Sequence, residues 1–165
     1  MPPDSSGLRF NRGQERADSP EPYEASFLQG RFLATGGLEG RNPEGRRVLY
    51  VVVETGMRPS GVVNLRPENI RLDATVPHVR VVPTAQAGLK NKASRREVPL
   101  VGVALMALQA QPEGFPRYRL KPDSFSAAAN KFLSENGLKP TPRHSVYSLR
   151  HSFEIRGRQA GVPEG

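Results

Sequence analysis

The sequence contains no cysteine, so it has neither a disulfide framework nor thiolate ligands for a metal ion, and nothing in it argues for export. No apolar run is long enough to cross a bilayer, and the longest cluster, Val48 to Val53, predicts a short buried element. The N-terminus is polar and proline-bearing, without the apolar core of a signal peptide. These absences predict a cytoplasmic protein with no membrane partner, no metal site and no cofactor.

Aromatic residues are also scarce, at 7%, and apolar residues make up only 36% of the chain. The 16 prolines and 16 glycines indicate that part of the chain is irregular. Residues 1–20 are rich in Pro, Ser, Asp and Gly and show no periodicity, which predicts a disordered segment. The remaining residues, 21–165, have room for one domain with a single core.

Positive charge is what the sequence has in excess, and it is unevenly placed. Residues 1–45 contain 5 Lys and Arg against 7 Asp and Glu, a net charge of −2, whereas residues 46–165 contain 19 against 9, a net charge of +10. A folded region this basic attracts nucleic acids, because each neutralised phosphate releases condensed counterions. Ribosomal and membrane-surface proteins share such compositions. The charge therefore indicates a protein that binds a polyanion but does not identify its function.

The apolar spacing predicts helices on either side of a small antiparallel sheet, a mostly helical α+β domain. The expected helices span about residues 23–36, 43–55, 59–65, 103–108 and 126–136, with a last one from about 145. Two strand-like runs, 77–82 and 95–100, are joined by a polar stretch, as a hairpin with a long basic tip requires. The side chains expected to face the core include Tyr50, Ala129, Phe132, Leu133, Leu149, Phe153 and Ala160.

Helix ends have their own local signals. Asn42 followed by Pro43 predicts an N-cap with proline at the first helical position, and Gly56 predicts the end of the same helix. Gly137 is expected to end the helix over 126–136.

Three segments carry more specific information. The first is Thr55-Gly56-Met57-Arg58, the second spans 89–100 and places Lys90 and Lys92 before Val98-Pro99-Leu100, and the third spans 142–153 and contains Tyr147-Ser148-Leu149-Arg150-His151. In this order and spacing they resemble the tyrosine recombinase (phage integrase) family. Its signature is a Thr-Gly-x-Arg turn, a lysine on a β-hairpin before a Val-Pro-Leu strand, and a His-x-Leu-Arg-His helix start. Residues 65–70 also fit the family's strand entry, and the resemblance covers about residue 25 to the C-terminus.

The resemblance implies site-specific DNA recombination or integration, in which a tyrosine hydroxyl attacks a backbone phosphate and a phosphotyrosine intermediate forms. Arg58 and Arg150 would clamp the phosphate, because forked guanidinium groups match its oxygens and keep their charge. Lys90 would be the general acid that protonates the departing 5′-oxygen. Lys92 takes that role if the hairpin has a different register, and the other lysine then contacts phosphate. For either arginine the alternative is a surface salt bridge, and the flanking motifs favour the phosphate clamp over it.

The family usually has histidine three residues before the second arginine, where this chain has Tyr147. That spacing keeps Tyr147 and Arg150 on one helix face, so the phenol can donate to a phosphate oxygen. Packing of Tyr147 at the edge of the core is the equally weighted alternative. Further DNA contacts are expected from Arg95, Arg96, His144 and His151. For His144 a plain loop position is the alternative, and for His151 a hydrogen bond that braces the fold.

Other features depart from the family pattern. Gly61 stands where the family has a glutamate that orients the first arginine, and Gly157 stands where a large apolar residue is usual. The family continues past the last helix into a Gly-His segment and the nucleophilic tyrosine, and a helical core-binding domain precedes the catalytic domain. The resemblance therefore implies a catalytic domain truncated before its nucleophile.

Two functions follow from the resemblance. One is a DNA strand transferase present as an inactive fragment, and the other is a catalytically inactive DNA-binding remnant or accessory of an integrase. The expected partner is double-stranded DNA in the nucleoid, on which the resemblance implies a homo-oligomer (the family tetramer), and no small-molecule substrate is expected. An RNA-binding protein is a third interpretation, but the basic residues are not interleaved with the aromatic groups that stack on single-stranded bases.

Overall fold

The computed structural model describes residues 42–82 and 95–163. Its elements, in chain order, are α3 (Pro43–Thr55), α4 (Pro59–Val63), the 3-10 helix η4 (Pro67–Asn69), β1 (Ile70–Arg71), β2 (His78–Val81), β3 (Arg96–Pro99), α5 (Gly102–Ala110), α6 (Pro122–Glu135) and α7 (Val146–Gln159). This order of helices, sheet and helices confirms the α+β class. In these two ranges no helix combines the length and apolar character that a membrane span needs.

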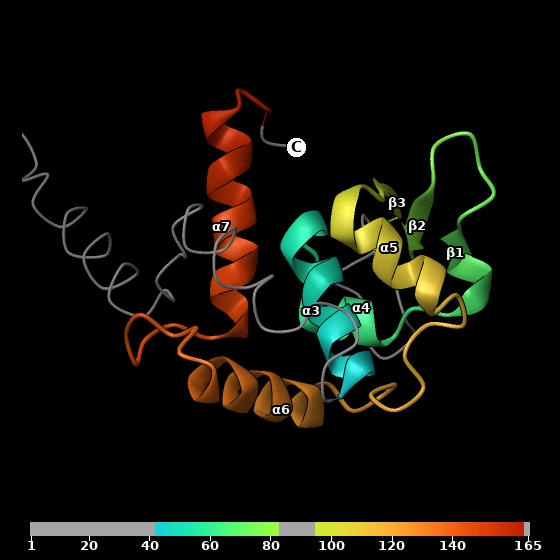
Figure 1. The fold of residues 1–165 in the computed structure, drawn as a ribbon. Coiled ribbons are helices and arrows are strands. Elements are labelled where there is room, and N and C mark those ends of the chain that lie inside the picture. Colours follow the sequence, from blue (N-terminus) through green and yellow to red (C-terminus); the bar gives the residue numbers. More distant parts are fainter. Residues whose placement is uncertain (1–41, 83–94, 164–165) are drawn as a thin grey trace, which may run out of the picture.

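Helix α3 is the centre of the fold. All its residues from Val48 to Val53 are buried, as a helix that is apolar on every side requires. Helices α4, α5, α6 and α7 pack around it (Figure 1). The short buried element predicted for this apolar cluster is confirmed, and Tyr50 belongs to the core as expected.

The predicted ends of α3 are confirmed. Asn42 is the N-cap with φ 57°, its side-chain oxygen accepts a hydrogen bond from the Gly45 N–H at 3.3 Å, and Pro43 occupies the first turn. Gly56 ends the helix with φ 63°, a left-handed conformation that glycine adopts without strain.

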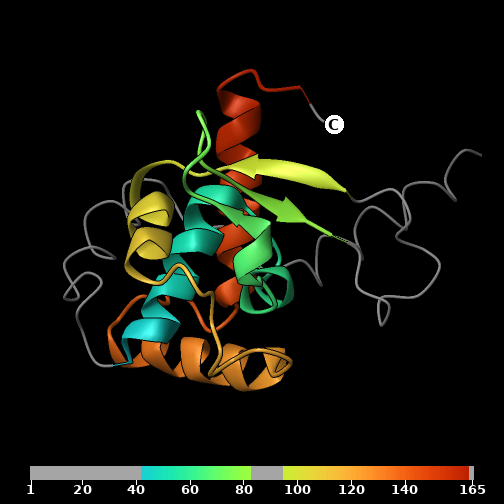
Figure 2. The ribbon, with the colours of Figure 1, turned by 90° about the vertical axis from the view of Figure 1, so that its right-hand side faces the viewer.

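The sheet has three antiparallel strands in the order β1-β2-β3. Its register pairs Ile70 with Val79 and Val79 with Val98. Strands β2 and β3 confirm the two predicted runs, and the short strand β1 adds a third that the strand-like runs did not include. Ile70 and Val79 are buried, so this face of the sheet covers the helical core. Figure 2 shows β2 and β3 side by side next to the helices.

The last helices differ from expectation at their ends. Helix α6 begins at Pro122 instead of about residue 126, because proline at the first turn is already set for helical geometry. It is capped by Asn136, and Gly137 follows with φ 65°. On α7, Leu149 is buried, but Ala160 is exposed, so the core position expected for Ala160 is wrong. The last turn of α7 extends past α3 and α5 (Figure 1).

Candidate nucleic-acid interface

The turn between α3 and α4 carries the first predicted arginine. The Thr55 hydroxyl donates to the Val51 carbonyl at 2.5 Å and accepts from the Met57 N–H at 3.2 Å, which links the turn to the last turn of α3. The Met57 side chain is buried and anchors the turn in the core. Arg58 follows with extended backbone as the N-cap of α4, and its side chain is exposed.

Gly56 allows this turn to lie directly against α7. A Cβ at this position would clash with the ring of Phe153 and would have to adopt a positive φ. Glycine alone combines that backbone conformation with the close approach. The Gly56 position therefore brings the Arg58 turn and α7, far apart in the sequence, into contact.

Arg150 makes the polar link between these two segments. Its Nη1 donates to the Gly56 carbonyl at 2.7 Å, and its Nη2 lies 3.1 Å from Oε1 of Glu154 on the next turn of α7. The side chain of Arg150 is 24% exposed. Since Gly56 lies two residues before Arg58, the contact joins Arg150 to the turn that bears the other predicted clamp residue.

The beginning of α7 is closed by the chain itself. Ser145 and Ser148 form a capping box, in which the Ser145 hydroxyl accepts from the Tyr147 N–H and the Ser148 hydroxyl accepts from the Ser145 N–H. The Val146 N–H donates to the Asn130 side chain at 3.0 Å. The free N–H groups that an anion would need at this helix start are therefore already occupied, so any phosphate site here depends on side chains.

Three other predicted residues lie on or next to α7. Tyr147 is 47% exposed in the first turn, three residues before Arg150. His151 is partly exposed, with Nδ1 3.6 Å from Oε2 of Glu154. His144 is buried, and its Nδ1 lies 2.9 Å from the Thr141 hydroxyl. The contact of His151 is with a residue of its own helix and is longer than a hydrogen bond. The bracing role of His151 and the DNA contacts of all three residues stay predictions.

Glu154, which contacts both Arg150 and His151, is not among the site residues predicted from the sequence. The available signal was its spacing of four residues from Arg150 on a predicted helix, where oppositely charged side chains meet. Gly61, where the family has a glutamate, has open space around it: an added Cβ would meet only the Met57 methyl at 3.7 Å.

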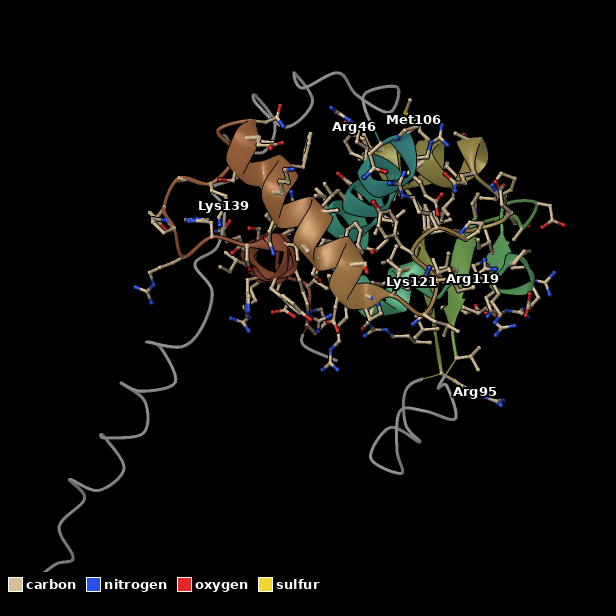
Figure 3. All side chains as sticks on the ribbon, turned by 90° about the horizontal axis from the view of Figure 1, so that it is seen from below. Arg46, Arg95, Met106, Arg119, Lys121 and Lys139 are labelled. Carbon is tan, nitrogen blue, oxygen red and sulfur yellow. The ribbon has the colours of Figure 1, made fainter. Side chains whose placement is uncertain are left out.

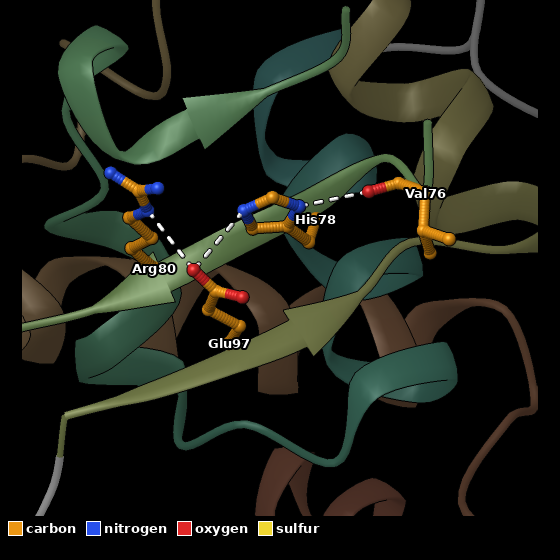
Figure 4. Close-up of polar contacts among 4 residues, drawn as sticks. All are labelled: Val76, His78, Arg80 and Glu97. Atoms are coloured by element: carbon orange, nitrogen blue, oxygen red, sulfur yellow. Dashed lines mark hydrogen bonds and ion pairs between the residues drawn. The ribbon is translucent and has the colours of Figure 1, made fainter. Parts of the chain in front are cut away.

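The base of the β2–β3 hairpin is held by a charged cluster (Figure 4). Oε1 of Glu97 accepts from Arg80 Nε at 3.2 Å and lies 3.6 Å from His78 Nε2. Nδ1 of His78 lies 2.8 Å from the Val76 carbonyl, which only accepts, so Nδ1 carries the hydrogen. Arg80 and Glu97 are direct cross-strand partners, so this ion pair favours the observed register.

The two candidate lysines belong to the segment predicted to form the tip of the hairpin. Lys90 and Lys92 lie outside the described residues, as do the helix predicted over 23–36 and the segment 1–20. Arg95 and Arg96 are the first described residues after this segment, and both side chains are exposed. Figure 3 shows Arg95 reaching outward from the end of the sheet.

A small pocket lies between α3 and α6, at the other end of α3. Leu49, Phe125 and Phe132 are among its lining residues, and the Arg46 guanidinium stands 4.6 Å from the centroid of the Phe132 ring. A helix of 13 residues is about 20 Å long, so this pocket is remote from the Gly56 end. None of the predicted site residues lines it.

Two solved structures have a fold similar to that of this chain. A variant of the Tn1549 transposon integrase, solved in complex with transposon right end DNA, matches with a TM-score of 0.59 and 14% sequence identity, over 86% of this chain and 54% of that one. The same integrase with circular intermediate DNA matches with a TM-score of 0.59 and 16% identity, over 86% and 55%.

The fold of the chain is therefore similar to that of the Tn1549 transposon integrase, which confirms the fold expected from the motif resemblance. It spans about half the length of the integrase chains it matches. No protein-family model matches the sequence, and no curated protein does.

Proposed function

We propose that this chain contributes the phosphate-binding part of a site-specific DNA recombinase or integrase. The observation that carries the proposal is the hydrogen bond from Arg150 to Gly56, which joins α7 to the Arg58 turn in a fold shared with a transposon integrase. Two guanidinium groups that bind the same phosphate would stabilise the charge that develops on its oxygens during attack. The charge of residues 46–165, net +10, favours duplex DNA as the partner.

The proposed reaction is strand cleavage and rejoining. The oxygen of a tyrosine hydroxyl forms a bond to phosphorus and gives up its proton to water, the bond from phosphorus to the 5′-oxygen breaks, and Lys90 or Lys92 gives its proton to that oxygen. Arg58 and Arg150 bind the non-bridging oxygens throughout. Rejoining reverses these steps with another 5′-hydroxyl. Assembly of several copies on DNA, in the nucleoid, is part of the same proposal.

A DNA-binding titration tests the proposed clamp. We expect the wild-type chain to bind duplex DNA with an affinity that falls steeply as salt rises, measured by fluorescence anisotropy at several salt concentrations. Arg58→Ala and Arg150→Ala should each weaken binding about tenfold, because a charge-assisted hydrogen bond is lost. Each should also reduce the slope of log K against log salt by about 0.9, the value for one phosphate contact.

Arg117→Ala is the matched control. It removes the same charge from an exposed arginine whose backbone N–H donates to Glu44 at the start of α3, far from Gly56. Binding by Arg117→Ala should stay within about twofold of wild type, since only the diffuse field changes. The clamp is wrong if Arg117→Ala weakens binding as much as the two site variants. Preferential competition by single-stranded RNA would favour the RNA-binding alternative.

The same titration addresses the inactive alternative. A DNA-binding remnant or accessory of an integrase would show the same affinity and salt dependence as an active domain. Measuring the exchange of DNA strands in the presence of an active integrase separates the active domain from the remnant. An active domain should change the amount of strand exchange, whereas a remnant should change only the amount of DNA bound.

A further inference from the structure

Arg150 is held at two points, and one of them is a carboxylate. Nη1 donates to the Gly56 carbonyl at 2.7 Å, and Nη2 pairs with Glu154 Oε1 at 3.1 Å. The second oxygen of Glu154 lies 3.6 Å from His151 Nδ1, so one carboxylate contacts both Arg150 and His151 on α7. Two attachments on different nitrogen atoms give the planar guanidinium one orientation. They use two of its five N–H groups, and within residues 42–82 and 95–163 the other three have no hydrogen-bond partner.

Helix stability does not account for this ion pair. Along a helix the favourable order places the acidic residue before the basic one, in keeping with the helix dipole, and here Glu154 follows Arg150. Both side chains are partly exposed, at 24% and 37%, and such surface pairs contribute little to folding. The effect of the ion pair that matters here is the orientation that it gives to the Arg150 guanidinium.

We propose that Glu154 is a positioning residue, which fixes the guanidinium of Arg150 in the orientation that receives a DNA phosphate. This inference rests on the proposed function, because it needs Arg150 to contact phosphate. The carboxylate repels a phosphate, so it costs some electrostatic attraction while it reduces the freedom that Arg150 loses on binding.

The repulsion weakens DNA binding and the positioning of Arg150 strengthens it, so substitutions of Glu154 can separate the two effects. If Glu154 acts only through its charge, its removal tightens DNA binding whatever residue replaces it. If it positions Arg150, the outcome depends on the replacement. Glu154→Gln keeps an oxygen that accepts from Nη2 and loses the repulsion, whereas Glu154→Ala loses both.

The experiment measures the affinity of the full 165-residue chain for a duplex DNA fragment at several salt concentrations. We expect Glu154→Gln to bind at least as tightly as wild type with the same salt slope. Glu154→Ala should bind about three- to tenfold more weakly, with a slope smaller by up to about 0.9, although its net charge is more positive. Glu135→Ala is the matched control, since Glu135 forms an i,i+4 pair with Lys131 on α6. It should bind as wild type or slightly tighter.

Two outcomes overturn the inference in distinguishable ways. If Arg150→Ala leaves affinity and slope unchanged, the proposed DNA site is wrong and the positioning role falls with it. If Arg150→Ala weakens binding but Glu154→Ala binds as tightly as Glu154→Gln, the site stands and Glu154 does not position Arg150.

If Glu154→Ala perturbs the fold, the positioning role can be tested on wild type and Glu154→Gln by a measurement without DNA. In wild type the Nη protons of Arg150 should give separate nitrogen–hydrogen NMR signals, because rotation of the held guanidinium is slow. Glu154→Gln should keep them separate. Signals that are already averaged in wild type would overturn the inference.

Discussion

Arg150 and Arg156 both donate to carbonyl oxygens at the end of α3, from Nη1 to Gly56 at 2.7 Å and from Nη2 to Val53 at 2.8 Å. Carbonyls in the last turn of a helix lack partners within the helix and carry the negative end of its dipole. The two arginines satisfy them and attach α7 to α3. Arg150 thus stabilises the fold as well as forming the proposed site, so its variants need a thermal unfolding curve beside each binding curve.

Tyr50 gives a stability prediction at the residue scale. Burial raises the pKa of its phenol above the ordinary value of 10.0, and the charge of Arg46 offsets part of that rise. The folded state therefore holds the Tyr50 proton more tightly than the unfolded state does. Its contribution to stability is fully present below about pH 10 and is lost as pH rises through the folded pKa, by at most about 1.4 kcal/mol per pH unit.

Tyr50→Phe should remove this term. Urea unfolding at pH 8 and near pH 11 should show a larger loss of unfolding free energy in wild type than in Tyr50→Phe. Each protein is compared with itself at two pH values, so a hydrogen bond lost in both conditions cancels. Equal losses in the two proteins would mean that the buried phenol contributes nothing to the alkaline instability.

At the scale of elements, the helix ends were predictable where a local signal exists. Asn42-Pro43 and Gly56 mark the ends of α3 because their backbone preferences act within a few residues. The start of α6 at Pro122 was missed because the apolar periodicity becomes clear only later in the helix. The contact of Gly56 with Phe153 could not be read from spacing, since it joins segments nearly a hundred residues apart.

Alanine substitutions at Gly157 in α7 and at Gly56 at the end of α3 should change the unfolding free energy in opposite directions. Gly157 lies inside α7, and an added Cβ would meet nothing within 4 Å, so Gly157→Ala should raise the unfolding free energy by about 0.5–1 kcal/mol. Gly56→Ala should lower it by more than about 2 kcal/mol, because a positive φ and the Phe153 ring both oppose a side chain. Urea unfolding checks both, and a destabilised Gly157→Ala would show that α7 is packed on that side.

At the scale of the whole molecule, the sequence predicts the class and the motif order, and the fold confirms the class. The roles of the individual residues stay predictions. The turn of Arg58 and helix α7 meet at one end of α3, but the assignment of Lys90 over Lys92 depends on residues 83–94, which the structure does not describe. A lysine on a long hairpin tip has no local signal that fixes its register, which is why spacing alone left both open.

The tyrosines of the described residues differ in what they can reach. Tyr50 and Tyr118 are buried, at 2% and 4% exposure, and the Tyr118 hydroxyl accepts from Asn42 Nδ2 at 2.7 Å. Tyr147 is the exposed one, at 47%, and it stands three residues before Arg150 on the same helix. Tyr23 lies outside the described residues. Tyr147 is thus the described tyrosine to test as a nucleophile.

We expect the polypeptide of residues 1–165 to form no covalent adduct with DNA. Displacement at phosphorus needs the attacking oxygen in line with the leaving oxygen, and a phenol one helical turn from Arg150 flanks the clamp instead. The test is a nicked suicide substrate incubated with the purified chain and resolved on a denaturing gel. A protein–DNA band that disappears in Tyr147→Phe would make Tyr147 the nucleophile. A band that appears only when a second polypeptide supplies a tyrosine would instead show that the phosphate clamp works and that the attack comes from another segment.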